Sequence, residues 1–196
     1  DTDRSRGLGD VYKRQGYRYV VQTLQDRGAS DVLFAMNSRY DVPGYGYQIA
    51  MGETALAESW QSRDYLSHNH CMLGHLYSWL FSGIGGISQE SGSTAYKRIV
   101  IDPQIVGDLR DARVSFRSPY GLIRSEWKDA PDEFVQTIEI PANATARIYL
   151  PATDPAKVTE SGKPVSGRKD MAVESGTDGR IELHVGSGVY RIAVEK

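Results

Sequence analysis

The spacing of the apolar residues changes near Gly85-Gly86-Ile87, and this change divides the chain into two parts. Before it, apolar residues recur at the spacing of amphipathic α-helices. After it, apolar and polar residues alternate, which is typical of half-buried β-strands. Helices followed by runs of strands indicate an α+β fold. We therefore expect a helical part first and an antiparallel β-sandwich second.

The helical part contains three candidate helices and, from Tyr45 to Met51, a short piece that is either helical or irregular. Two short ones lie on either side of Gly28, which suits a helix end, and Ser30 is a candidate cap for the second. Their apolar residues are Tyr17, Val20, Val21 and Leu24, then Val32, Leu33 and Met36. A long loop is expected over residues 53–67, and the strongest helix from about Asn69 to Ser82. Its wide buried stripe would comprise Leu73, Leu76, Tyr77, Leu80, Phe81 and Ile84.

The second part consists of short alternating runs separated by turn residues. Pro119-Tyr120-Gly121 is one such turn, and Glu160-Ser161-Gly162-Lys163 is typical of a hairpin. Trp127 in this part and Trp79 in the helical part are expected in the cores. Parallel strands need a crossover connection, usually a helix, and no helical pattern lies between these runs. A parallel sheet is therefore not expected.

Size and composition set the expected domain limits. Residues 1–15 are polar and lack a hydrophobic period, so we interpret them as an unstructured leader or a sequence artefact. Residues 16–87 offer few helices for a stable core, which predicts the tail of a larger helical domain. Residues 88–196 form the expected β-sandwich domain. The most apolar stretch, residues 79–87, is far shorter than the roughly 20 residues of a membrane-spanning helix.

The charge and the cysteine count exclude some classes of protein. A net charge of -2 argues against nucleic acid or an anionic membrane as the partner, because both attract a basic surface. Cys71 is the single cysteine, so an intrachain disulfide is impossible, and we expect a buried thiol. Large secreted bacterial enzymes often lack disulfides, so this count does not indicate the cytoplasm.

A candidate catalytic centre lies in the long loop and at the start of the third helix. Glu58 stands between small residues and Trp60, and Asn69-His70 follows a short loop later. An ordinary glutamate, with a pKa of about 4.3, is ionised at neutral pH and can take a proton from water. His70 can bind a sugar hydroxyl. Trp60 fits sugar stacking and core packing equally well, and Asn69 is expected to be a helix cap first and a sugar contact second.

The neighbouring carboxylates and histidines are less suited to the catalytic role. Glu53 and Asp64 lack the flanking pattern of Glu58, so we interpret them as loop charges. Zinc at His68, His70 and His75 is not favoured, because the spacing is poor for one helical face and no carboxylate completes a ligand set. We expect no metal and no cofactor.

Three runs of residues resemble the C-terminal part of bacterial α-L-rhamnosidases, the enzymes of glycoside hydrolase family 78. They are the run Asp41-Val42-Pro43-Gly44-Tyr45-Gly46-Tyr47-Gln48, the pattern Gly-x-Thr-x-Leu-x-Glu-x-Trp over residues 52–60, and Asn69-His70 with Gly74. The resemblance implies the last helices of an (α/α)6 toroid followed by an accessory β-sandwich. Ala57 departs from the family, whose members often carry an aromatic residue there.

The resemblance also implies an activity. The chain is similar to part of an inverting hydrolase of terminal α-L-rhamnosyl residues, with Glu58 as the general base and His70 as a sugar ligand. The family's general acid lies upstream, in the rest of the same catalytic domain, so we expect this chain to be inactive alone. We expect the periplasm or the cell exterior. Two alternatives stay open: an inverting toroidal glycosidase for another sugar, such as a fucosidase or glucuronidase, and a non-catalytic carbohydrate-binding protein.

Overall fold

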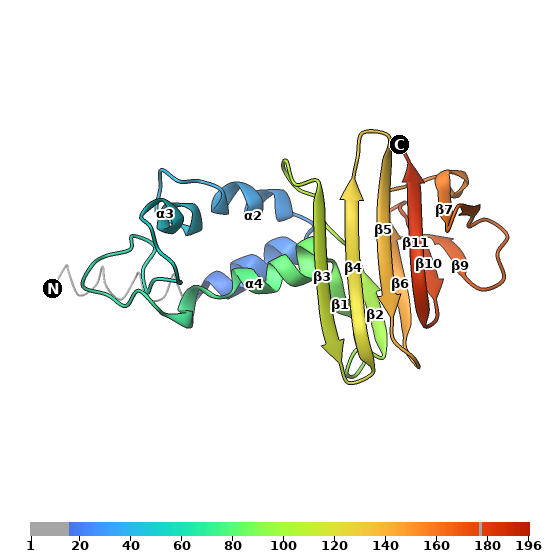
Figure 1. Cartoon of the computed structure of the whole chain (residues 1–196), viewed down its shortest axis with the longest axis horizontal. Coiled ribbons are helices and arrows are strands. Elements are labelled where there is room, and N and C mark those ends of the chain that lie inside the picture. The colour runs from blue at the N-terminus through green and yellow to red at the C-terminus, as the bar shows by residue number, and fades with distance from the viewer. Residues whose placement is uncertain (1–15, 177) are drawn as a thin grey trace. The chain divides into compact units, whose positions relative to one another are not determined.

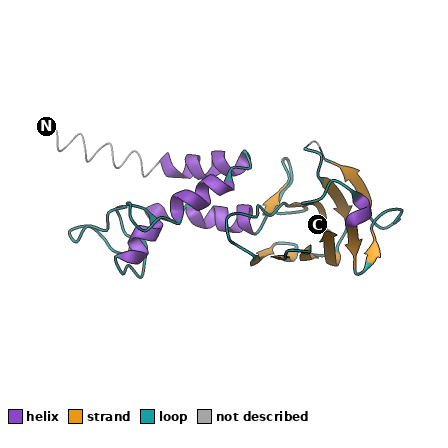
Figure 2. Ribbon diagram, turned by 90° about the horizontal axis from the view of Figure 1, so that it is seen from above, coloured by secondary structure: helices purple, strands orange, loops and turns teal. Residues whose placement is uncertain are grey.

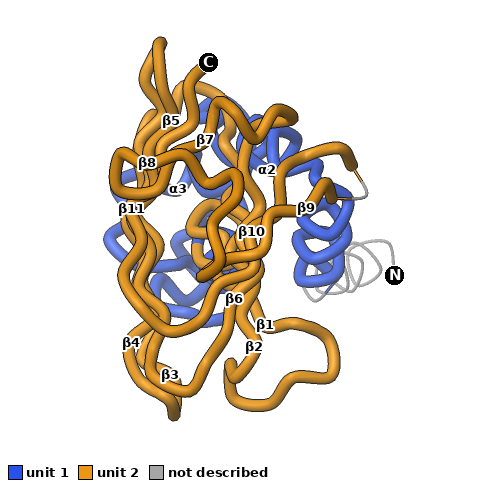
Figure 3. Tube along the Cα trace, turned by 90° about the vertical axis from the view of Figure 1, so that its right-hand side faces the viewer, with its two compact units in different colours: residues 1–80 blue, residues 81–196 orange. Residues whose placement is uncertain are grey.

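The computed structural model describes residues 16–176 and 178–196, and the predicted leader at residues 1–15 lies outside them. The chain forms two compact units, which divide between Leu80 and Phe81 (Figure 3). The first unit is helical and the second contains the sheets (Figure 2). Among the described residues, no helix is both long and apolar enough to cross a membrane.

The helical unit is built from short elements joined by a long irregular loop. Residues 16–26 are helical. The elements that follow are α2 (Ser30–Asn37), α3 (Tyr45–Ala50), the 3₁₀ turn η1 (Cys71–Leu73) and α4 (Leu76–Trp79), which continues into the π-helical turn η2 (Leu80–Ile84). Residues 51–70 contain neither helix nor strand, so the predicted loop is confirmed and is longer than expected.

The prediction of one regular helix from Asn69 to Ser82 is wrong. Hydrogen bonds of the i→i+3 kind run from Gly74 N–H to the Cys71 carbonyl and from Tyr77 N–H to the Gly74 carbonyl. A 3₁₀ turn has three residues per turn, so positions spaced for an α-helix rotate away from a common face. Tyr77 is 74% exposed and Leu80 is 43% exposed, so the predicted buried stripe is broken.

Ser30 does not cap α2, which was its predicted role. It is the first helical residue, and the capping position is Ala29, which makes no side-chain cap bond. The buried Ser30 hydroxyl instead accepts a 2.7 Å hydrogen bond from Trp79 Nε1. Trp79 is buried as predicted. A polar residue at a helix start therefore serves the tertiary packing here, because a buried indole N–H needs an acceptor.

The second unit is a β-sandwich of two sheets (Figure 1). The five-stranded sheet has the order β1 (Ile87–Gln89), β2 (Arg98–Ile101), β6 (Thr145–Leu150), β10 (Ile181–Val185), β9 (Ala172–Ser175). The six-stranded sheet has the order β3 (Asp111–Ser118), β4 (Gly121–Asp129), β5 (Glu133–Ile140), β11 (Gly188–Glu195), β7 (Val158–Glu160), β8 (Lys163–Pro164). A 3₁₀ turn, η3 (Pro155–Lys157), precedes β7.

The alternation read from the sequence places the apolar side chains of most strands in the core. In β5, for example, Phe134, Ile138 and Ile140 are buried. Gln136 also points inward and is fully buried, and its Nε2 donates to the buried Ser125 hydroxyl of β4 at 3.1 Å. The predicted sandwich is thus confirmed, and its core contains one polar pair that the hydrophobic pattern does not reveal.

One pair of strands is parallel, which the sequence did not predict. Arg98 to Ile101 of β2 pair in parallel with Thr145 to Ile148 of β6. The other strand pairs of the described residues are antiparallel. The crossover between β2 and β6 is made by β3, β4 and β5 of the other sheet, so no helix is needed. Strand connections through the opposite sheet leave no helical signal in the sequence.

The chain turns tightly at the entrance of the sandwich, where Gly86 meets the segment after β2. Gly86 has φ of +73°, and a Cβ placed on it would lie 2.3 Å from Pro103 N and 2.6 Å from Asp102 C. Asp102 N–H also donates to the Gly86 carbonyl at 2.9 Å. Both the left-handed conformation and the closeness of the backbone therefore require glycine at this position.

We predict that Gly86→Ala destabilises the sandwich more than Gly162→Ala does. Gly162 has nearly the same φ, +76°, but has no atom within 4 Å of its would-be Cβ. The control, Gly162→Ala, should therefore lose roughly 1–2 kcal/mol of unfolding free energy from the backbone conformation alone. Gly86→Ala should lose a further 1–3 kcal/mol or so from overpacking. Hydrogen exchange of the β6 and β10 amides measures both losses, and equal losses would contradict the steric argument.

Candidate active site

Two segments of the irregular loop lie side by side and carry the predicted site residues. His70 N–H donates to the Leu56 carbonyl at 2.7 Å, and Glu58 N–H donates to the Ser67 carbonyl at 2.8 Å. Residues 56–58 and 67–70 are thus joined by backbone hydrogen bonds, although neither segment is part of a helix or strand. This pairing places Glu58 and His70 on neighbouring segments of the loop.

The Glu58 carboxylate is held by the segment opposite. Glu58 is half-buried, and its Oε2 accepts a 3.2 Å hydrogen bond from Ser67 N–H. A backbone donor of this kind limits the rotation of the carboxylate. The same residue, Ser67, therefore binds Glu58 through both its carbonyl oxygen and its N–H. The carboxylate is oriented and partly open to solvent, as a proton acceptor for water needs to be.

Asn69 and His70 precede the first 3₁₀ turn rather than beginning an α-helix. Asn69 N–H donates to the Ser67 hydroxyl, which in turn donates to the Asn69 carbonyl, both at 3.2 Å. The turn η1 begins only at Cys71, so the predicted role of Asn69 as the cap of a long helix is wrong. Asn69 is exposed and His70 half-buried, so both side chains have solvent-accessible surface for contact with a ligand.

Trp60 is packed between two tyrosines. The ring centroids of Tyr17 and Tyr45 lie 5.1 Å and 5.0 Å from that of Trp60, with interplanar angles of 73° and 86°. The Tyr45 hydroxyl donates to the Leu73 carbonyl, and the Tyr17 hydroxyl donates to Asn37 Oδ1 at 2.9 Å. Burial raises the pKa of both tyrosine hydroxyls, so both stay protonated donors. The cluster fixes the Trp60 ring, which remains half-buried.

Glu53 is a loop charge, as expected, but it is paired and largely buried. Its side chain is 10% exposed, and Oε1 lies 2.7 Å from His68 Nδ1. This pair joins the beginning of the loop to the segment that carries His70. Asp64, the other competing carboxylate, is exposed. The sequence could not distinguish the two, because the partner of Glu53 lies on the far side of the loop.

The histidines and the single cysteine of this region differ in how they compare with the sequence predictions. Among the residues that the structure describes, no three His, Cys, Asp or Glu side chains are grouped closely enough to hold a metal ion. Cys71 is exposed in the described structure, so the prediction of a buried thiol is wrong. It lies in the short η1 turn, where three residues cannot present a continuous buried face.

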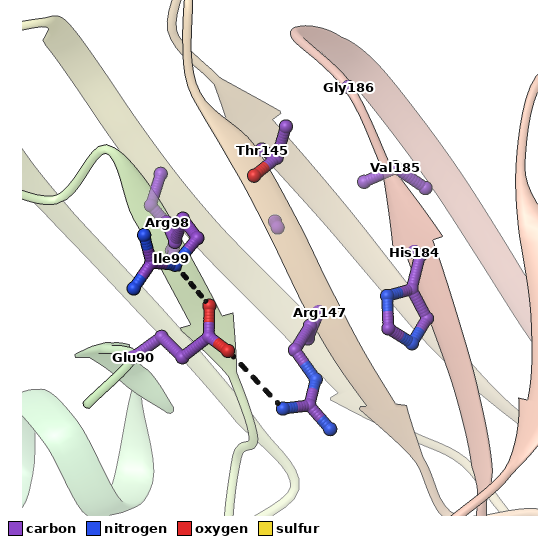
Figure 4. A pocket seen from close by; sticks show the side chains of 9 residues that line it. Glu90, Arg98, Ile99, Thr145, Arg147, His184, Val185 and Gly186 are labelled. Carbon is purple, nitrogen blue, oxygen red and sulfur yellow. Dashed lines mark hydrogen bonds and ion pairs between the residues drawn. The ribbon is translucent and has the colours of Figure 1, made fainter. Parts of the chain in front are cut away.

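The sandwich carries a separate polar groove on the outer face of its five-stranded sheet (Figure 4). The groove has a volume of about 400 Å³ and is lined by residues of β2, β6 and β10 and by Glu90. Arg98 Nε lies 2.8 Å from Glu90 Oε2, and Arg147 Nε lies 2.5 Å from Glu182 Oε1. No Trp, Tyr or Phe side chain is among its lining residues, so it lacks the large apolar ring that stacks on a sugar. This groove is therefore a weaker candidate for a sugar site than the loop that carries Glu58 and His70.

Comparison with known proteins gives the family. A model described as the bacterial alpha-L-rhamnosidase 6 hairpin glycosidase domain matches residues 9–84, and one described as the bacterial alpha-L-rhamnosidase C-terminal domain matches residues 86–164. The chain belongs to the bacterial α-L-rhamnosidase family. The resemblance and the fold class read from the sequence are confirmed, because the rhamnosidase models follow the same order of helical and β-rich domains.

Individual rhamnosidases agree with the family models. An α-L-rhamnosidase of Streptomyces avermitilis is 30% identical over 185 residues, which cover 89% of this chain and 17% of that protein. An α-L-rhamnosidase of Formosa agariphila is 25% identical over 186 residues, which cover 92% of this chain and 19% of that protein. The solved S. avermitilis enzyme in complex with L-rhamnose superimposes with a TM-score of 0.81 at 28% identity, over 98% of this chain and 19% of that one. The α-L-rhamnosidase of Dictyoglumus thermophilum gives 0.79 at 28% identity, over 91% and 20%. The chain thus spans about a fifth of its rhamnosidase relatives.

We predict a pH effect in the rhamnosidase sandwich. The hydrogen bond from Arg147 holds the pKa of Glu182 below its usual range. A depressed pKa stabilises the fold above the unfolded-state value of about 4.3, and this contribution disappears as the pH falls through the lower native pKa. Arg147→Gln should raise the Glu182 pKa and make the loss of stability on acidification shallower.

Carbon-13 NMR titration of the glutamate carboxyls in the 196-residue chain measures this change directly. Arg124→Gln is the control, because Arg124 lies 3.8 Å from Glu126 and 3.7 Å from Glu139 on the other sheet. It should leave Glu182 unchanged. An unchanged Glu182 titration in Arg147→Gln would show that Arg147 does not set this pKa.

Proposed function

We propose that this chain is the part of an inverting α-L-rhamnosidase that supplies the general base, and that Glu58 is that base. The observation that carries the proposal is the hydrogen bond from Ser67 N–H to the Glu58 carboxylate, made by the segment that also bears His70. Family membership gives the reaction class. The structure adds an ionisable group that is oriented, partly accessible and joined to the segment of a sugar-binding candidate.

The proposed reaction is a single displacement at the anomeric carbon. Glu58 takes a proton from water, and the water oxygen attacks the carbon on the face opposite the leaving oxygen. A second carboxyl group, about 6.5–9.5 Å away, gives its proton to the leaving oxygen as the glycosidic bond breaks. In this proposal the acid comes from a part of the enzyme outside these 196 residues. The products are the free sugar with inverted configuration and the released alcohol.

The sugar would be held by the neighbours of Glu58. His70 would exchange a hydrogen bond with a hydroxyl of the rhamnosyl ring, and Asn69 would add a second polar contact. The half-buried Trp60 ring would pack on the C–H side of the sugar, as aromatic rings do in carbohydrate sites. The two tyrosines that fix Trp60 reduce the entropy lost on binding, because the ring is already held in place.

The helical unit also has the surface of an incomplete domain. Among the described residues, ten exposed large hydrophobic side chains precede Phe81 and only two follow it. The ten are Tyr19, Val20, Val32, Met36, Tyr40, Ile49, Met51, Tyr65, Tyr77 and Leu80. A surface with so many exposed apolar groups indicates an interface. We propose that these side chains pack against the remaining helices of the catalytic toroid, which would also supply the acid.

We predict that Glu58→Gln in the complete enzyme lowers kcat by about 10²- to 10⁴-fold, because the amide cannot accept the proton from water. Hydrolysis of an aryl α-L-rhamnoside measures the rate, and thermal unfolding monitors the fold. Asp64→Asn is the matched control, since it removes an exposed carboxylate of the same loop. A near-normal rate for Glu58→Gln would remove Glu58 from the mechanism. A panel of other aryl glycosides tests the sugar.

We also predict the configuration of the first product. Direct displacement by water converts an α-rhamnoside into β-rhamnose, which then slowly equilibrates with the α form. Proton NMR of the anomeric signal during the first minutes of hydrolysis distinguishes the two. Initial appearance of α-rhamnose would indicate a covalent intermediate and would change the role of Glu58 from base to nucleophile.

A further inference from the structure

We propose that Gln48 is a positioning residue that fixes the backbone on both sides of Glu58. This inference rests on the proposed role of Glu58 as the base. Gln48 lies in α3 and is 3% exposed. Its Oε1 accepts a 3.3 Å hydrogen bond from Ala57 N–H, and its Nε2 donates to the Ser59 carbonyl at 3.2 Å. One buried amide thus binds the residue before Glu58 and the residue after it.

The two hydrogen bonds of the Gln48 amide take the place of the regular secondary structure that the loop lacks. Residues 51–70 have no helix or strand, and the two backbone bonds that Glu58 and His70 make across the loop are not continued into a ladder. The side-chain amide of Gln48 has one acceptor and one donor group, and it offers them to a backbone N–H and a backbone carbonyl as a neighbouring strand would. The two bonds fix the backbone before and after Glu58, and therefore its Cα.

The helix that carries Gln48 is itself held by close packing and by hydrogen bonds. A Cβ on Gly46 would lie 2.2 Å from the Arg39 carbonyl oxygen, so α3 packs directly on the backbone of the preceding turn. The hydroxyl of Tyr45, at the first position of α3, is bonded to the Leu73 carbonyl. Glu53 N–H donates to the Gln48 carbonyl at 3.0 Å, which ties the start of the loop to the same helix.

Other buried polar groups after Glu58 do not share this task. The hydroxyls of Ser59 and Ser62 are buried and have no hydrogen-bond partner in the part of the chain that the structure describes. Ser67 orients the carboxylate at the far end of the Glu58 side chain. Because the Ser67 carbonyl also accepts from Glu58 N–H, Ser67 holds Glu58 itself, whereas Gln48 holds the residues on either side of it.

The test is Gln48→Met in the complete enzyme, a change that keeps the length and removes both hydrogen bonds. A displaced base loses rate without weakening the sugar contacts, so kcat should fall by about 10- to 100-fold with KM nearly unchanged. The Ala57 amide should exchange with solvent faster in hydrogen-exchange mass spectrometry. Ser30→Ala is the control, because it removes the acceptor of the buried Trp79 N–H in the same unit and should lower the melting temperature without lowering kcat.

A second variant, Gln48→Glu, tests the two bonds by pH. The introduced carboxylate accepts from Ala57 N–H but repels the Ser59 carbonyl, whereas the protonated acid can bind both. The ratio of its kcat to that of the wild type should therefore rise as the pH is lowered. If Gln48→Met does not fold, the pH dependence of this kcat ratio tests the proposal instead, and a ratio that stays constant with pH would contradict it.

The outcomes separate this inference from the proposed function. If Glu58→Gln is inactive while Gln48→Met keeps its kcat, the positioning role of Gln48 is wrong and the role of Glu58 as the base is retained. The same conclusion follows if the exchange rate of the Ala57 amide is unchanged in Gln48→Met. The same holds if Ser30→Ala loses kcat as Gln48→Met does, because the effect is then general destabilisation. If Glu58→Gln and Gln48→Met are both active, the proposed function itself fails.

Discussion

The backbone hydrogen bonds between residues 56–58 and 67–70 are the contacts on which the candidate site depends. Without them, Glu58 and His70 would be two positions in a loop that has no regular structure. The pairing lets Ser67 orient the carboxylate, and it leaves the flanks of Glu58 open to Gln48 on the other side. The site is thus built from local pairing inside a loop, supported by short helices, rather than from the end of one long element.

Much of the sandwich was predictable because alternation reports directly which side chains face the core. The same alternation is found in parallel and antiparallel strands, so it could not show that β2 pairs with β6 in parallel. It also could not show that Gln136 is buried, because its partner Ser125 lies on another strand. In the helical part, the apolar spacing near Gly74 suggested one α-helix, and the tighter 3₁₀ winding there made that prediction wrong.

The site was predictable in part. Glu58, Trp60, Asn69 and His70 could be singled out because their residue types suit sugar chemistry and their spacing resembles a known family. The roles of Gln48 and Glu53 could not be predicted, because they depend on partners brought close by folding. One weak signal existed for Gln48: it is the polar side chain of a six-residue helix that is otherwise aromatic, glycine or aliphatic. A polar amide that is buried in such a helix needs hydrogen-bond partners from elsewhere in the fold.

The parallel join between β2 and β6 has a consequence for the order of assembly during synthesis. On one side of this join lies the β1–β2 hairpin, and on the other lie β6, β10 and β9. As the chain leaves the ribosome, the hairpin has one unsatisfied edge until the whole three-strand meander of the opposite sheet has been made. The contact between β2 and β6 is therefore distant in sequence, and such contacts form slowly because a long loop must close first. Translation speed through residues 102–145 thus determines how long that edge remains open to pairing with another nascent chain.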